Sequence, residues 1–189
     1  NVFSQTRGRI SGIVYGGNSR KIRNYLQLSN KLFIIHNSKN ENKLGYFKTE
    51  LIKPISPLYF NDKKRTSALL SLCAILNTLL PESQPNKKIY ESYEEFIKSI
   101  NLDNWIILYV FFELNLIKNL GYDPDLNRFS EDVFRSELKK IKIDTFTYEI
   151  PVFLISKKIP ITLSDELIKK SLYFTRNIIQ NRFFIPNNL

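Results

Sequence analysis

The stretch "RGRISGIVYGGNSRKIR", residues 7–23, holds five basic residues, four glycines and no carboxylate. Its apolar residues predict a strand over residues 9–15, and the run "GGNS" (16–19) predicts a loop after it. No Asp or Glu occurs in residues 1–40, which contain seven basic residues: Arg7, Arg9, Arg20, Lys21, Arg23, Lys31 and Lys39. The whole chain of 189 residues has a net charge of +10, so most of that charge lies in its first fifth.

Two further strands are predicted downstream of this stretch. "KLFIIH" (31–36) and "LGYFKTELI" (44–52) are rich in β-branched and aromatic residues, and the polar run 37–43 between them predicts a hairpin loop. Pro54 and Pro57 then end the region, because proline cannot continue strand pairing. Residues 1–57 are therefore expected to form a small β-barrel or partial barrel.

The pattern changes to helical from about residue 63. Apolar residues recur at helical spacing in four segments: 64–81, 86–100, 103–121 and 164–183, the last with Ser164 as the expected N-cap. The segment 103–121 is apolar on nearly all sides, which is typical of the central helix of a bundle. Residues 122–158 are expected to be an irregular insert with one short β-like run, "TFTYEIPVF" (145–153). The sequence thus predicts an α+β protein, with a β-barrel at 1–57 and an all-α domain at 58–189.

Few residues could carry catalytic chemistry. Cys73 is the single cysteine, so a multi-thiolate metal site cannot be built within the chain. His36 is the single histidine, and because no orienting partner is evident in the sequence we expect it to be a surface or partly packed residue and not a general base. Asp123 and Asp125 flank a proline in "GYDPDL" and are expected to form a turn. We therefore expect neither an enzyme nor a cofactor or metal site. No apolar stretch is long enough for a membrane span, and no export leader is recognised.

The basic stretch favours nucleic-acid binding. Each phosphate that a cation neutralises releases condensed counterions, glycines allow close approach of the main chain, and aromatic rings can stack on unpaired bases. The DNA-binding candidates are Arg7, Arg9, Tyr15, Arg20, Lys21, Arg23 and Tyr25. Binding to a membrane surface and the absence of any ligand remain open at this point.

Several segments together resemble the RecO family of bacterial DNA-repair and recombination mediators. They are "VFSQTRGRISGIVYGGNSRKIRNYLQLSN" (2–30), "LLPESQPNKKIYESYEEFI" (79–97), "WIILYVFFELNLIKNLGYDPDL" (105–126) and "YFTRNII" (173–179). The resemblance implies an oligonucleotide-binding (OB-fold) barrel, a helical C-terminal domain and a non-catalytic activity. It implies binding of single- and double-stranded DNA and annealing of complementary strands. It also implies loading of the recombinase RecA together with RecR, an interaction with the C-terminal tail of the single-stranded-DNA-binding protein, and a cytoplasmic, nucleoid-associated location.

Two departures from the family pattern change these expectations. The family's first barrel strand has no counterpart here and the chain contains no methionine, so we expect a fragment without its native N-terminus. Some members build a zinc site just after the "LGY…DL" segment, where this sequence has Phe129, so no metal site is implied. Candidates for partner contacts are Lys118, Lys169 and Arg176. The alternatives are an RNA- or ribosome-associated OB-fold protein, a non-catalytic adaptor and, more remotely, an enzyme of unknown type.

Overall fold

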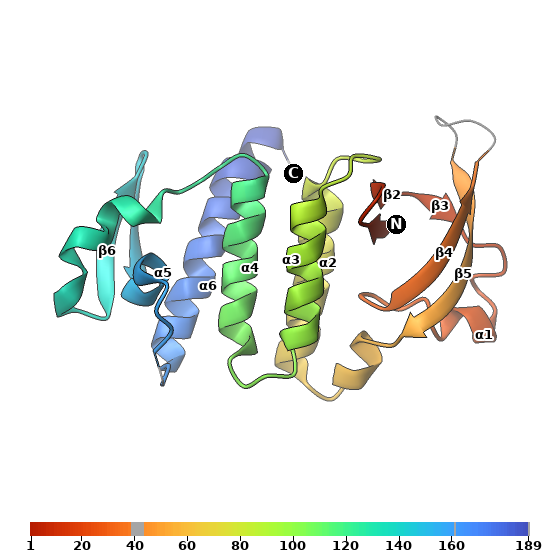
Figure 1. The fold of residues 1–189 in the computed structure, drawn as a ribbon, viewed down its shortest axis with the longest axis horizontal. Helices are drawn as coiled ribbons and strands as arrows, with labels where there is room; N and C mark the ends of the chain where they lie inside the picture. Colours follow the sequence, from red (N-terminus) through yellow and green to blue (C-terminus); the bar gives the residue numbers. More distant parts are fainter. Residues whose placement is uncertain (39–43, 161, 189) are drawn as a thin grey trace. The chain divides into compact units, whose positions relative to one another are not determined.

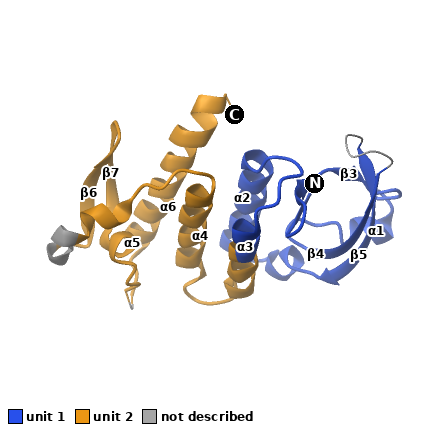
Figure 2. Cartoon of the chain, turned by 45° about the horizontal axis from the view of Figure 1, so that its top comes forward, with its two compact units in different colours: residues 1–91 blue, residues 92–189 orange. Residues whose placement is uncertain are grey.

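A computed structural model describes residues 1–38, 44–160 and 162–188 of the chain. Lys39 and most of the predicted hairpin loop, residues 39–43, lie outside the described residues. The chain divides into two compact units, residues 1–91 and residues 92–189 (Figure 2).

Unit 1 begins with five strands arranged in two sheets. Their bounds are β1 (Val2–Ser4), β2 (Gly8–Ile10), β3 (Gly12–Ile13), β4 (Lys31–Asn37) and β5 (Gly45–Lys53). β1 and β2 pair antiparallel, whereas the second sheet has the order β3-β5-β4, with β3 parallel and β4 antiparallel to β5. The strands predicted at 31–36 and 44–52 are confirmed. The expected barrel is not found in closed form among the described strands (Figure 1).

The single strand predicted over residues 9–15 is wrong, because it breaks at Ser11 into β2 and β3, which belong to different sheets. The break is caused by contacts with a distant segment, residues 82–83, which follows the helix over residues 63–79. The Ser83 N–H donates to the Arg9 carbonyl (2.7 Å), and the Ser11 N–H donates to Glu82 Oε1 (3.1 Å). The Ser11 side chain is the largest cause of the lowered pKa of Glu82, and the positive charge of Arg9 and the Ser11 N–H lower it further. Residues 9–11 therefore pair with this later segment as well as with their own sheet.

The two long helices of unit 1 lie where the helical spacing of the sequence predicts them. The bounds are α1 (Arg20–Arg23), the 3-10 helix η1 (Ser56–Tyr59), α2 (Lys63–Leu79) and α3 (Lys87–Ser99), within which the boundary between the units falls. Leu69, Leu72 and Leu76 of α2 are buried, as their helical spacing predicts. The loop predicted over residues 16–19 is confirmed by its turns. The single helical turn α1 that follows was not predicted, and its N-cap, Ser19, accepts a hydrogen bond from the Ile22 N–H.

Unit 2 contains helices and one hairpin. The bounds are α4 (Trp105–Asn119), the 3-10 helix η2 (Leu126–Arg135), β6 (Leu138–Ile143), β7 (Phe146–Pro151), α5 (Val152–Ser156), α6 (Asp165–Ile179), the π-helix η3 (Gln180–Phe184) and the 3-10 helix η4 (Ile185–Asn187). α6 contacts both α4 and β7 (Figure 1). Within the irregular insert expected over residues 122–158, the predicted β-like run 145–153 is confirmed by β7, but β7 pairs with the unpredicted strand β6 in an antiparallel hairpin. The all-α domain expected over residues 58–189 is therefore wrong. The predicted N-cap is confirmed, because Ser164 Oγ accepts from the Leu167 N–H.

One carboxyl group lies in the core between α4 and α6. Glu113 is only 5% exposed, and Thr175, which donates a hydrogen bond to Glu113 Oε2, is fully buried. Burial raises the pKa of Glu113 above its ordinary value of 4.5, although hydrogen bonds from Thr175 and Tyr109 oppose this rise. The central apolar helix predicted over 103–121 is thus confirmed, with one protonatable group on its buried side.

The first prediction concerns Gly8, which has φ +67° and whose missing Cβ would lie 2.0 Å from the Gln84 carbonyl oxygen. Gly16 has nearly the same φ, +69°, but its Cβ would meet only Ile22 Cδ1, at 3.7 Å. Gly16→Ala should lower the free energy of unfolding by the ~1–2 kcal/mol that a left-handed residue costs. Gly8→Ala should lower it further, since the methyl group must also displace the Gln84 backbone. Urea denaturation of both variants measures the difference, and equal losses would contradict this packing.

The second prediction concerns the pH dependence that Glu113 gives to stability. Its pKa is raised in the folded chain, so above about pH 4.5 the unfolded chain releases the proton first. The stability that Glu113 contributes is therefore present at lower pH and lost as the pH rises through the folded pKa. Relative to wild type, Glu113→Gln should gain up to about 1.4 kcal/mol per pH unit in this window.

Chemical denaturation at a series of pH values measures this gain. Glu95→Gln, which changes an exposed carboxyl group on α3, is the matched control and should follow the wild-type curve. A constant difference between Glu113→Gln and wild type across the pH range would show that folding does not shift the pKa of Glu113, which would contradict this prediction.

Candidate nucleic-acid interface

The net charge of the chain belongs to unit 1. Residues 1–91 contain 15 Lys or Arg and five Asp or Glu, which gives +10, whereas residues 92–189 contain 13 of each and are neutral. A charge of this size on a unit of 91 residues creates a positive potential that attracts polyanions.

Three of the predicted DNA-binding cations lie together on α1. The chain reaches this helix through a tight loop in which the Gly17 N–H donates to the Val14 carbonyl (3.1 Å) and the Ser19 N–H to the Gly16 carbonyl (2.8 Å). The side chains of α1 that follow are exposed, and no acidic partner engages them in the described part of the chain: Arg20, Lys21 and Arg23. They remain available to an anionic ligand.

Arg7 is exposed and lies against the ring of His36. Arg7 Nη1 and His36 Nδ1 are 2.8 Å apart, and because a guanidinium can only donate, Nδ1 must accept. The other ring nitrogen, Nε2, lies only 2.2 Å from the position that a Cβ on residue 45 would occupy. Glycine at this position therefore makes room for the ring. His36 thus orients Arg7 and is not arranged as a general base.

Two other predicted residues are already engaged within unit 1. Arg9 is half-buried, and its Nε donates to the Leu80 carbonyl at the end of α2 (2.8 Å). The hydroxyl of Tyr25 donates to the Thr49 carbonyl (2.9 Å), and its side chain is half-buried. Both residues therefore link segments that are distant in the sequence.

Tyr15, in contrast, is 72% exposed, and its ring lies beside that of Tyr46, with centroids 5.4 Å apart. The sheet next to it exposes residues that the sequence analysis did not single out, among them Phe33 and Ile35 of β4. Their strand is apolar on both faces, so its sequence pattern could not show which face the rest of the chain covers. The register of the sheet shows which residues share a face, and their exposure shows which face is left uncovered.

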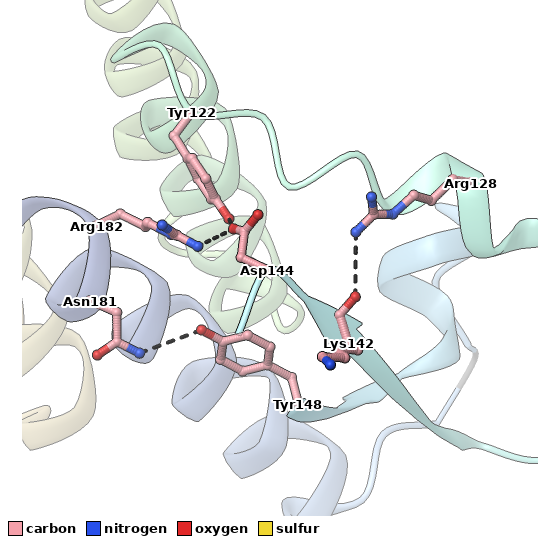
Figure 3. A network of polar contacts seen from close by, with 7 residues as sticks. All are labelled: Tyr122, Arg128, Lys142, Asp144, Tyr148, Asn181 and Arg182. Carbon is pink, nitrogen blue, oxygen red and sulfur yellow. Dashed lines mark hydrogen bonds and ion pairs between the residues drawn. The ribbon is translucent and has the colours of Figure 1, made fainter. Parts of the chain in front are cut away.

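Unit 2 contains a polar network that the sequence analysis also missed (Figure 3). The Asp144 carboxylate accepts hydrogen bonds from the Tyr122 hydroxyl (2.7 Å) and from Arg182 Nη2, and the Arg182 guanidinium lies 4.9 Å from the centre of the Tyr122 ring. Partial burial is the largest cause of the raised pKa of Tyr122, and the bond to Asp144 adds to it. The network joins the end of α4, the β6–β7 turn and η3, and its groups satisfy one another.

The three partner-contact candidates have different surroundings. Lys118 forms an ion pair with Asp123 (2.6 Å), which also accepts a hydrogen bond from the Asp125 N–H, as the predicted turn requires. Lys169 and Arg176 are exposed on α6. They lie four residues before and three residues after Tyr173, which is 66% exposed, so the three share one helical face.

The described residues contain neither a candidate metal site nor a helix suited to cross a membrane. No three His, Cys, Asp or Glu side chains within them gather as metal ligands would. No described helix combines the length and the hydrophobicity that crossing a membrane requires.

Comparison with known proteins identifies the relatives of this chain. The family model for the C-terminal part of recombination protein O matches residues 61–141. A DNA repair protein RecO from Ehrlichia chaffeensis is 34% identical over 129 residues, which cover 67% of this chain and 52% of that protein. RecO proteins from Cereibacter sphaeroides and from a Wolbachia pipientis of Culex pipiens are each 28% identical, over 72% and 88% of this chain.

The chain spans 52% to 66% of the length of these three relatives. These matches confirm the resemblance seen in the sequence, and the family match covers α2, α3, α4 and most of β6. The chain is therefore related to the DNA repair proteins of the RecO family, whose C-terminal sequence pattern it carries in residues 61–141.

Proposed function

We propose that this chain is a non-catalytic DNA repair and recombination mediator, whose unit 1 binds single- and double-stranded DNA and anneals complementary strands. The observation that carries the proposal is the separation of charge: unit 1 has a net charge of +10 and unit 2 has none. Annealing brings two polyanions together, and a cationic surface that contacts only sugar and phosphate reduces their repulsion while the base edges stay free to pair.

The arrangement of the strands supports an OB-like origin for residues 1–57. An OB fold is a five-stranded, partly open barrel, and β1 to β5 are five strands within residues 2–53. Only Ser11 separates β2 from β3, so the two sheets continue into one another along the chain. A curved, incomplete barrel of this kind would present the loop and α1 at its surface.

Unit 2 would then serve protein partners. Its charges are balanced in number, and some are paired, as in the ion pair between Lys170 and Glu149. The helical face with Lys169, Tyr173 and Arg176 offers cations and an exposed ring to an acidic, aromatic peptide such as the C-terminal tail of the single-stranded-DNA-binding protein. From the family relationship we further propose that the chain cooperates with RecR in loading RecA and acts at the nucleoid.

The third prediction tests the placement of the interface. Replacing Arg20, Lys21 and Arg23 together by Glu should weaken binding to short DNA about 100-fold or more at low salt, because three phosphate contacts become repulsive. Gel shift and fluorescence anisotropy with labelled single strands and duplexes measure the loss. The exposed positions of all three residues predict an unchanged unfolding transition.

A matched control separates local contacts from overall charge. Lys98, Lys157 and Lys158 are exposed in unit 2, and reversing them to Glu changes the net charge by the same amount. This control should weaken binding only slightly. Equal losses in the two triple variants would reject α1 as the contact, and tighter binding of structured RNA than of DNA would favour the RNA-binding alternative.

A further inference from the structure

One face of the three-stranded sheet in unit 1 has an unusual composition. Cross-strand partners in a sheet share a face, and the pairs Phe33–Glu50, Ile35–Lys48 and Ile13–Tyr46 follow from the register. The ring contact with Tyr46 adds Tyr15 to the same face. We call this the outer sheet face; it consists of Ile13, Tyr15, Phe33, Ile35, Tyr46, Lys48 and Glu50.

The described chain leaves the outer sheet face largely uncovered. Phe33 is 53% exposed, Ile35 47% and Ile13 48%. On the opposite face, by contrast, Phe47 is only 4% exposed, and its ring lies 2.6 Å from where a Cβ on Gly12 would be. The apolar side chains of the outer face therefore lie on the side of the sheet that does not pack into unit 1.

Cations surround and enter this face. Lys48 lies across from Ile35 and two residues after Tyr46, and Lys31 and Lys53 pair at one end of the same hairpin. α1 starts close to Tyr15, since Ile22 Cδ1 lies 3.7 Å from the Cβ position of Gly16. Glu50 is the one acidic residue on the outer sheet face among the described residues.

We infer that the outer sheet face is a stacking surface for the bases of an unpaired nucleic-acid strand, with Tyr15 and Phe33 as its principal rings. The inference rests on the proposed function and assigns a substrate class to one surface of unit 1. Rings stack only on bases whose faces are free, so duplex DNA cannot use this surface. Lys48 and the cations of α1 then contact the phosphates of the stacked strand.

The charge argues against a protein occupant. Lysine is depleted in the cores of protein–protein interfaces, whereas Lys48 lies among the apolar side chains of this face. A second copy of the chain would bring another unit with a charge of +10 against the first, which opposes self-association. A polyanion with aromatic bases matches both the charge and the exposed rings.

The experiment compares single-stranded and duplex probes on the full chain. Tyr15→Ala and Phe33→Ala, alone and combined, are titrated against a labelled oligothymidine of about 20 nucleotides and a hairpin duplex of similar size. Each substitution should weaken binding to the single strand about tenfold, while binding to the duplex stays within about twofold. The slope of log affinity against log salt should be unchanged, because no phosphate contact is lost.

Three controls accompany these variants. Tyr15→Phe and Phe33→Tyr keep a ring and should retain single-strand binding. Phe146→Ala removes a ring of unit 2 that is 42% exposed and belongs to no proposed interface, and it should change neither affinity. The affected side chains are exposed, so the unfolding transitions of all variants should match that of wild type.

The outcomes separate the two proposals. A wild-type chain that binds neither probe at low salt overturns the proposed function itself. Wild-type binding that the double variant retains overturns the stacking surface alone, as does an equal loss for single strand and duplex. Self-association of the wild type that Phe33→Ala abolishes in sedimentation would assign the face to a second copy and also overturn it.

Discussion

The arrangement of unit 1 depends on how closely residues 8–13 approach their neighbours. At Gly8 a side chain would overlap the Gln84 carbonyl, and at Gly12 it would overlap the Phe47 ring. Without these two side chains, one short piece of chain can pair with β1, with β5 and with the segment after α2. The carboxylate of Glu82 and the side chain of Arg9 complete this junction. The cations of α1 and the outer sheet face, which begins at Ile13, are exposed.

The two units differ in their net charge and in the pairing of their charged side chains. In unit 2 the carboxylates of Asp123, Asp144 and Glu149 each have a cationic partner, and the unit is neutral as a whole. In unit 1 the basic side chains outnumber the acidic ones threefold, and those of α1 have no acidic partner among the described residues. Such a division suits a protein in which one part contacts nucleic acid and the other contacts proteins. The exposed rings beside the cations add a reason for a preference for unpaired strands.

The parts of this structure that the sequence predicted are those with local causes. α2, α3, α4 and α6 follow from helical spacing, and β4 and β5 from their β-branched and aromatic residues. The break at Ser11 and the engagement of Arg9 depend on residues 71 positions away, which no local pattern contains. Of the β6–β7 hairpin, β7 lies within the predicted β-like run 145–153, whereas β6 was missed although Ile141 and Ile143 alternate with lysines. Of the predicted interface, Tyr15 and α1 are exposed, whereas Tyr25 is tied to Thr49 by a contact that only the fold creates.

Photocross-linking tests most directly the claim that unit 1 carries the nucleic-acid interface. A single strand containing 4-thiothymidine, irradiated with the full chain and mapped by peptide mass spectrometry, reports which residues touch the bases. The account predicts cross-links in residues 7–25 and on β4, with Tyr15 and Phe33 as the main sites. Cross-links confined to residues 92–189 would contradict it, since they would place the strand on the unit that has no net charge.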